Sequence, residues 1–291
     1  MRTITAVAAV CAVVAVTVSA QRTITRSVFV SAVDVKGRPV LDLTPSDFEL
    51  TEDGVTRTVT RATLGKTPLR VVLLVDSSTR VGPMVSSFRN ALNAFVDWLP
   101  ETEEIAFVSS GGQIRVRTQP GDPREKLRNE IARFSAEGGA NAFFDTMLEA
   151  DERFLRTAPG QWPVFVILMA DYGEGTREPD VKAYNTFMNE FLARGGTAHA
   201  VIVSGKRTGP TTDIIANLVD NTNGLRTTTI TDNTLTTLLT EIADRVAGDH
   251  VAMLNRYEVA FAGDPKLTQP TIKVSVAREG VQVQMSVRRP F

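Results

Sequence analysis

Continuous apolar runs alternate with helical patterns across the middle of the chain. Residues 71–75, 164–169 and 198–203 are apolar almost throughout, which is typical of parallel strands buried on both faces. Apolar residues between these runs recur at the spacing of one helix face. The helices predicted in this way cover about residues 84–99, 123–134, 144–155, 181–193, 213–219 and 235–246, and further strands are predicted at 105–108, 114–116 and 225–230. We therefore predict a doubly wound, mostly parallel α/β sheet over residues 68–248.

The two segments that flank this α/β segment have a different pattern. In them apolar and polar residues alternate, which favours half-buried strands. In the amino-terminal segment, residues 21–67, Asp53-Gly54 separates two alternating runs and predicts a hairpin turn. In the carboxyl-terminal segment, residues 249–291, the alternation returns in three further runs. We expect the two segments to pair into one small β-sandwich beside the α/β domain.

The first twenty residues form an apolar run of another kind. Arg2 precedes an apolar stretch over residues 6–18, and the small residue Ala20 ends it, which is the layout of a secretory signal peptide. The stretch is too short to cross a bilayer comfortably, although a retained anchor is an alternative. We therefore predict an exported, periplasmic or extracellular protein with no membrane span once residues 1–20 are removed. Cys11 is the only cysteine, so the mature chain would have no disulfide.

Composition and charge narrow the function classes. Apolar residues make up 43% of the chain and charged residues 22%, as in ordinary globular proteins, and the formal net charge is −1. Such a balance gives no reason to expect nucleic acid or an anionic membrane as a partner. The sequence also has no phosphate loop, dinucleotide fingerprint or Gly-x-Ser-x-Gly nucleophile motif.

Candidate chemistry lies where predicted strands end. In a doubly wound sheet the ligand site lies beyond the carboxyl ends of the strands, where the winding direction reverses. Asp76 and Ser78 follow the run at 71–75, Asp171 follows the run at 164–169, and Asn141 follows a pair of glycines. Carboxylate and hydroxyl oxygens of this kind are able to surround a hard divalent cation such as Mg²⁺ or Mn²⁺.

These residues resemble a known domain. The stretch 71–76 with Ser78, the glycines near 138 and Ala170-Asp171 is similar to the von Willebrand factor type A domain. Further stretches resemble a bacterial family of exported proteins that carry this domain. They are Asp34 to Gly37, residues 43–48, Glu52-Asp53-Gly54 and Tyr257. The resemblance covers nearly the whole mature chain and implies the same Rossmann-type α/β fold.

The resemblance also implies a metal-ion-dependent adhesion site, which uses Asp-x-Ser-x-Ser, a Thr on a second loop and an Asp on a third. Asp76, Ser78 and Asp171 match this pattern, whereas Arg80 replaces the second Ser and Asn141 takes the Thr position. A guanidinium is always charged and never a metal ligand. We hypothesise that Arg80 pairs with Asp76 or Asp171 in place of the cation. Alternatively, Arg80 turns outward and a weak metal site survives.

Four hypotheses for function follow from this altered set. The leading one is a non-enzymatic interaction module that uses no cofactor and binds an unknown protein partner through Ser78, Arg80, Asn141 and Asp171. The second is ligand binding that depends on Mg²⁺ or Mn²⁺ held by Asp76, Ser78 and Asp171. The third is a metal-assisted hydrolase that uses Asp76 or Asp171, and the fourth is a structural protein that binds no ligand at all.

Overall fold

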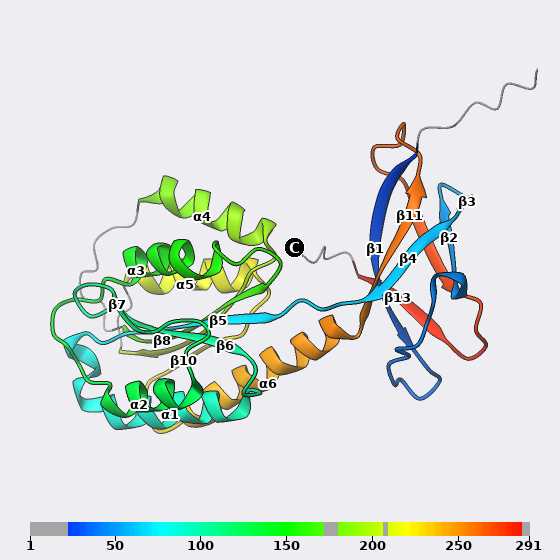
Figure 1. Cartoon of the computed structure of the whole chain (residues 1–291). Coiled ribbons are helices and arrows are strands. Elements are labelled where there is room, and N and C mark those ends of the chain that lie inside the picture. Colours follow the sequence, from blue (N-terminus) through cyan, green and yellow to red (C-terminus); the bar gives the residue numbers. More distant parts are fainter. Residues whose placement is uncertain (1–22, 172–179, 206–208, 287–291) are drawn as a thin grey trace, which may run out of the picture.

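A six-stranded sheet forms the centre of the larger of two domains (Figure 1). The computed structural model describes residues 23–171, 180–205 and 209–286, so the predicted signal peptide lies outside the described residues. The strand order is β10-β9-β8-β5-β6-β7, and every neighbouring pair is parallel except β6 and β7. The strands are β5 (Leu69–Val75), β6 (Glu104–Ser109), β7 (Arg115–Thr118), β8 (Trp162–Asp171), β9 (Thr197–Ser204) and β10 (Arg226–Thr229). This order confirms the doubly wound, mostly parallel sheet.

Helices cover both faces of the sheet (Figure 1). One layer consists of α1 (Val85–Trp98), α2 (Arg124–Arg133) and α6 (Leu235–Leu254), and the other of α3 (Phe143–Ala150), α4 (Val181–Ala193) and α5 (Pro210–Asn221). Successive residues of β5 point alternately into the two layers: Val71 and Leu73 into the first, Val72 and Leu74 into the second. Burial on both faces explains why the central strands are continuous apolar runs.

Three elements differ from the predicted helices and strands. The helix expected to continue to residue 155 changes at Asp151 into a π-helical turn, η3 (Asp151–Leu155). A 3-10 turn, η2 (Thr79–Met84), precedes α1. The last helix, α6, continues to Leu254 and therefore crosses residue 248, where the α/β segment was expected to end.

The smaller domain is built from both terminal β segments. One sheet has the order β13-β1-β11-β4 and the other the order β12-β2-β3, and all pairs are antiparallel. Their bounds are β1 (Ile24–Val33), β2 (Phe48–Glu52), β3 (Val55–Arg57), β4 (Val59–Leu64), β11 (Arg256–Gly263), β12 (Ile272–Val276) and β13 (Gln282–Ser286). The predicted pairing is confirmed, because β1 pairs with β11 and β2 with β12.

Both sheets of the smaller domain contribute to one apolar core. Val30 of β1, Leu50 of β2 and Phe261 of β11 are buried together in it. The predicted hairpin turn is also confirmed. Asp53 and Gly54 join β2 to β3 with φ angles of 48° and 82°, and a two-residue hairpin turn of this type requires positive φ at both residues.

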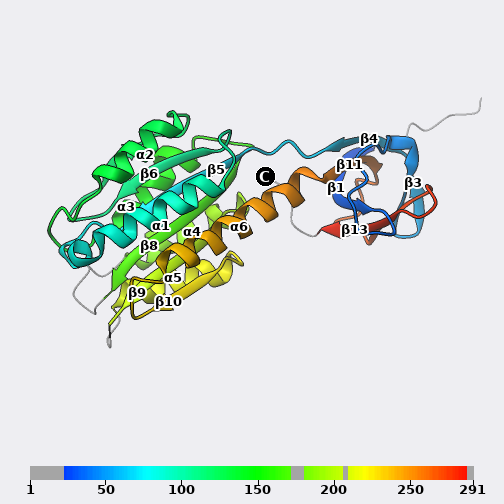
Figure 2. The ribbon, with the colours of Figure 1, turned by 90° about the horizontal axis from the view of Figure 1, so that it is seen from below.

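Two chain segments connect the domains, and they run side by side. The segment between β4 and β5 lies against the end of α6, where the Gly65 amide donates a hydrogen bond to the Arg256 carbonyl (2.7 Å). Both connections reach the α/β domain at the end where β5 begins, and Figures 1 and 2 show the smaller domain on that side of the sheet. The carboxyl ends of the strands therefore face away from the smaller domain. Within the described residues, no helix has the length and apolar character to cross a membrane.

Candidate functional site

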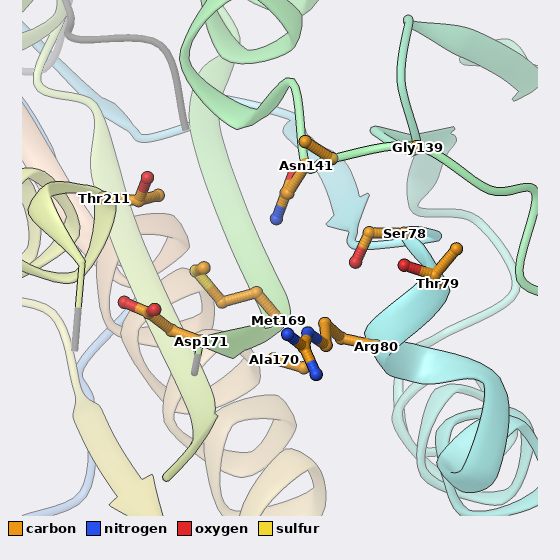
Figure 3. Close-up of a pocket in the computed structure, with 10 residues that line it drawn as sticks. Ser78, Thr79, Arg80, Gly139, Asn141, Met169, Ala170, Asp171 and Thr211 are labelled. Atoms are coloured by element: carbon orange, nitrogen blue, oxygen red, sulfur yellow. The ribbon is translucent and has the colours of Figure 1, made fainter. Parts of the chain in front are cut away.

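A cavity of about 180 Å³ opens at the carboxyl ends of β5 and β8 (Figure 3). The chain continues from β5 to β6 on one side and later returns to β8 on the other, so the winding direction reverses between β5 and β8. A ligand site is expected at such a point. The cavity is lined by Ser78, Thr79, Arg80, Gly139, Ala140, Asn141, Met169, Ala170, Asp171 and Thr211. The structure therefore brings together all four residues predicted to bind a partner.

Asp76, the remaining predicted metal ligand, does not line the cavity and is only 1% exposed. Its carboxylate accepts hydrogen bonds from the backbone amides of Ser78 (2.8 Å) and Ala170 (3.1 Å). Burial raises the pKa of Asp76, against the opposing effect of these hydrogen bonds and of the nearby Asn141 side chain. Asp76 thus joins the ends of β5 and β8 to each other.

Asp171, the last residue of β8, is held by the start of α5. Its two carboxylate oxygens accept hydrogen bonds from the Gly209 amide (3.0 and 2.8 Å), and one also accepts the Thr212 hydroxyl. Gly209 and Thr212 were not among the residues predicted from the sequence. A signal for them existed: Gly209-Pro210 follows the apolar run at 198–203 and opens a helix, so this loop also lies at a strand's carboxyl end.

The glycine loop at 138–141 approaches the cavity from the other side. The Gly112 amide donates to the Ala140 carbonyl (2.8 Å), and a Cβ atom on Gly139 would lie 3.2 Å from Gly112 Cα, so the two loops pack closely. Asn141 is 9% exposed, and its Oδ1 accepts a hydrogen bond from the Ser110 hydroxyl (2.6 Å). The Asn141 Nδ2 has no hydrogen-bond partner in the described part of the chain. It points into the cavity in Figure 3.

A buried polar network supports the loop that carries Ser78. The Ser77 hydroxyl accepts from the Gly111 amide (2.9 Å) and donates to Glu137 Oε2 (3.1 Å), while Arg117 pairs with Glu137 Oε1 (2.8 Å). A Cβ atom on Gly111 would lie 2.5 Å from the Ser77 carbonyl oxygen. The loop is therefore fixed by its neighbours before any ligand binds. This network was not predicted from the sequence, because its members lie far apart in the chain.

Arg80 stands at the mouth of the cavity, at the start of η2, with its guanidinium beside Ala170 (Figure 3). The hypothesis that it pairs with Asp76 or Asp171 stays a prediction. Figure 3 shows the Asp171 carboxylate turned to the side away from Arg80. Both aspartates accept hydrogen bonds from the chain's own amides and, at Asp171, from a hydroxyl.

This donor set fits a divalent cation poorly. A hard cation is held by oxygen ligands, and here a permanent cation, Arg80, lines the same cavity, while the carboxylate oxygens also accept hydrogen bonds from the chain. In the parts of the chain that the structure describes, no three His, Cys, Asp or Glu side chains gather closely enough to hold a metal ion.

Comparisons with known proteins agree with the fold. The sequence matches no family model and no curated protein. Among solved structures, a von Willebrand factor type A protein from Catenulispora acidiphila matches over 92% of this chain and 74% of its own, with 12% identity and a TM-score of 0.55. The resemblance proposed from the sequence is thereby confirmed for the fold: the chain has a von Willebrand factor type A-like fold.

A second solved protein matches only part of this chain in structure. Proximal thread matrix protein 1 from the mussel byssus, in two crystal forms, matches 64% and 62% of this chain at 14% identity, with TM-scores of 0.50 and 0.51. This chain covers 49% and 48% of the mussel protein, about half of its length.

Proposed function

We propose that this chain is an exported, non-enzymatic interaction module that binds a protein partner at the cavity without a metal ion. The contacts would come from the loops that carry Ser78, Arg80, Asn141 and Asp171. The observation that carries the proposal is the position of Arg80, whose charged side chain lines the cavity where the adhesion motif would supply a hydroxyl ligand. The layout of residues 1–20 supports export.

Two further observations support binding rather than catalysis. The cavity lies at the reversal of winding, where folds of this kind bind ligands. Among the described residues that line the cavity, no nucleophile is paired with a histidine as general base. His199 lies inside β9, and His250 lies in α6 at the opposite end of the sheet. The fold itself is that of a solved von Willebrand factor type A protein.

Calorimetry with MgCl₂ and MnCl₂ tests the metal-free part of the proposal. We expect no heat of binding from the unaltered protein. A double variant, Arg80→Ser with Asn141→Thr, restores the motif and should gain Mn²⁺ binding, which shows that the assay detects a competent site. A micromolar dissociation constant for Mn²⁺ in the unaltered protein would overturn the proposal.

Affinity capture in the presence of EDTA tests the partner-binding part. Secreted proteins of the source organism would be passed over the unaltered protein, over Arg80→Glu and over Arg133→Glu. Arg133 is a matched control, because its side chain is 76% exposed on α2 and does not line the cavity. We expect a partner that the unaltered protein and Arg133→Glu retain and Arg80→Glu loses. Equal retention by all three proteins would contradict binding at the cavity.

A further inference from the structure

We infer that His250 is a pH-sensitive switch between the two domains: its protonated ring holds the connection between β4 and β5 against α6, and loss of the proton releases that connection and loosens the hinge. His250 lies at the end of the sheet opposite to the cavity. The switch would therefore act whatever group the cavity binds.

The imidazole of His250 lies between two groups that accept hydrogen bonds and donate none. Its Nε2 is 2.9 Å from the Thr67 carbonyl oxygen, and its Nδ1 is 3.3 Å from a carboxylate oxygen of Glu103. A neutral imidazole carries one N–H group, whereas a protonated imidazole carries two. Only the protonated ring therefore donates to both groups at once.

The bond to Thr67 is the one that loss of the proton should break. A hydrogen bond to an ionised carboxylate is about twice as strong as a bond between neutral groups, so the remaining proton should stay on Nδ1, facing Glu103. Nε2 of His250 would then present a lone pair to the Thr67 carbonyl oxygen. Two acceptors that face each other form no hydrogen bond, so this contact with the connection would be lost.

The charges around the imidazole leave Glu103 as its electrostatic partner. Within α6, the neighbouring Arg245 and Asp249 pair with each other (2.7 Å). From α2, Arg124 donates to the backbone carbonyl of Glu103 (3.1 Å). From β8, the imidazole faces the ring of Trp162, which does not titrate, with 6.2 Å between the ring centroids.

The direction of the pKa shift agrees with this arrangement. Burial opposes the protonation of His250, but the hydrogen bonds with Glu103 and Thr67 and the charge of Glu103 together raise its pKa above the usual value of 6.5. The connection is therefore held at about pH 6 and released at a pH well above the raised pKa.

Two short connections form the hinge between the domains. In one of them, Asn255 alone separates α6 from β11. In the other, the Gly65 amide donates to the carbonyl of Arg256, the first residue of β11 (2.7 Å), so Gly65 moves with the smaller domain. A Cβ atom on Gly65 would lie 2.5 Å from the Met253 carbonyl oxygen, so this connection lies directly against the last turn of α6.

The α/β domain holds the same connection from Thr67 onward. His250 binds the Thr67 carbonyl, and the Trp162 amide donates to the Pro68 carbonyl (2.8 Å). Between the two anchored ends lies Lys66, whose side chain is exposed. Release of Thr67 would extend the unanchored part of the connection from Lys66 toward the α/β domain.

A groove of about 1080 Å³ beside the hinge gives the smaller domain room to tilt. The carboxyl-terminal ends of α4 and α5 line it from the α/β domain, and the connection and the start of β11 line it from the other side. The two domains are not packed against each other across this groove. Their relative orientation therefore depends on the hinge.

Nitrogen-15 NMR of the imidazole rings tests the protonation states directly. The chain has two histidines, and His199, whose pKa is lowered to about 4 by burial, serves as an internal control that stays neutral. For His250 we expect a proton on both ring nitrogens at about pH 6 and on Nδ1 alone at about pH 9. A proton that remains on Nε2 of His250 at about pH 9 would overturn the inference.

Pulsed EPR between two spin labels tests the hinge itself. Cys11 is the only cysteine, so Cys11→Ser removes the background reactivity. The labels are attached through Trp98→Cys on α1 and Val35→Cys in the smaller domain, where the native side chains are 52% and 76% exposed. We expect a narrow distribution of distances at about pH 6 and a broader one at about pH 9. Equal widths at the two pH values would contradict a pH-sensitive hinge.

Three variants separate the switch from a general effect of pH. His250→Phe keeps a ring but has no N–H group, so the distribution should be broad at both pH values. Glu103→Gln removes the facing charge and should lower the midpoint of the transition by about one pH unit. Glu101→Gln is a matched control on the same loop, 66% exposed, and should leave the midpoint in place. A transition that persists in His250→Phe, or an unchanged midpoint in Glu103→Gln, would overturn the inference.

Discussion

The two histidines occupy opposite kinds of environment, and His199 is the more deeply buried. It lies in β9, is 0% exposed, and its Nδ1 accepts a hydrogen bond from the Leu225 amide (3.0 Å). Burial lowers the pKa of His199 to about 4. A proton on Nδ1 would also turn an acceptor into a donor that faces the Leu225 N–H. His199 is therefore a neutral packing residue of the strand.

This environment predicts a dependence of stability on pH. The folded-state pKa of His199 is depressed below the unfolded value of 6.5, so its contribution is complete above pH 6.5 and is lost as the pH falls toward 4. The loss at about pH 5 is about 2 kcal/mol. The variant His199→Asn keeps an acceptor but does not titrate. The free-energy difference between the two proteins, measured by urea unfolding, should shift by that amount between about pH 7.5 and about pH 5; a constant difference would contradict the assignment.

Asp151 is a second buried ionisable residue, and its role is structural. Its side chain is 0% exposed and accepts two hydrogen bonds from Arg194 (2.7 and 2.8 Å), which ties the π-helical turn η3 to the end of α4. Asp151→Ala leaves the Arg194 charge without this partner and should lower the free energy of unfolding by about 3 kcal/mol. As a control, Glu149→Ala removes an exposed partner of Arg153 and should cost less than about 1 kcal/mol. Equal losses in the two variants would show that burial does not set the cost.

At the scale of elements, Tyr257 joins β11 to the loop before β2. Its hydroxyl accepts from the Leu43 amide (3.0 Å) and donates to the Val40 carbonyl (3.0 Å), while its ring packs against Phe48. Tyr257→Phe keeps the ring and leaves both backbone groups without a partner, so it should cost about 1–3 kcal/mol in unfolding free energy. Hydrogen exchange at the Leu43 amide should become faster. Unchanged exchange would contradict this anchoring role.

The elements that could be predicted from the sequence are those whose pattern is local. The run at 164–169 lies in β8, the helix at 181–193 has the predicted bounds, and Asp53-Gly54 forms the expected turn. Each of these depends on burial or turn chemistry within a few residues. The antiparallel direction of β7 and the extension of α6 depend on which distant segments pack against them, so a local pattern does not contain them.

The candidate site, too, could be predicted only in part from the sequence. Its place in the sheet followed from the strands and the reversal of winding, and the four residues predicted to bind a partner line one cavity, whereas Asp76 does not. The direction of each side chain did not follow. Asp171 turns to Gly209 and Thr212 because the start of α5 offers donors there, and that helix is contributed by another part of the chain.

At the scale of the whole molecule, His250 lies where the two connections between the domains meet. Its ring contacts the Thr67 carbonyl oxygen (2.9 Å) and Glu103 (3.3 Å). Burial alone would lower the pKa of His250, but the hydrogen bonds with Glu103 and Thr67 and the charge of Glu103 together raise it. Protonated His250 thus joins the connecting segment to the α/β domain.

The raised pKa of His250 determines the pH range in which this residue stabilises the folded state. The stabilisation is fully present below the unfolded value of 6.5 and is lost as the pH rises through the folded-state pKa. His250→Gln should therefore lower the melting temperature more at about pH 6 than at about pH 9. Glu103→Gln should reproduce this dependence, since it removes the negative charge that faces the imidazole. A larger effect of His250→Gln at high pH would contradict the ion pair.

The placement of the cavity at the far end of the sheet determines how copies of this molecule would act together. The helix α6 runs for 20 residues, about 30 Å, along the α/β domain and ends beside the smaller domain. Molecules attached to a common support by their smaller domains would project their cavities outward, clear of the support and of one another's attachment points. Contacts that are weak singly would then combine into a strong multivalent attachment to any partner that displays repeated copies of the group that the cavity binds.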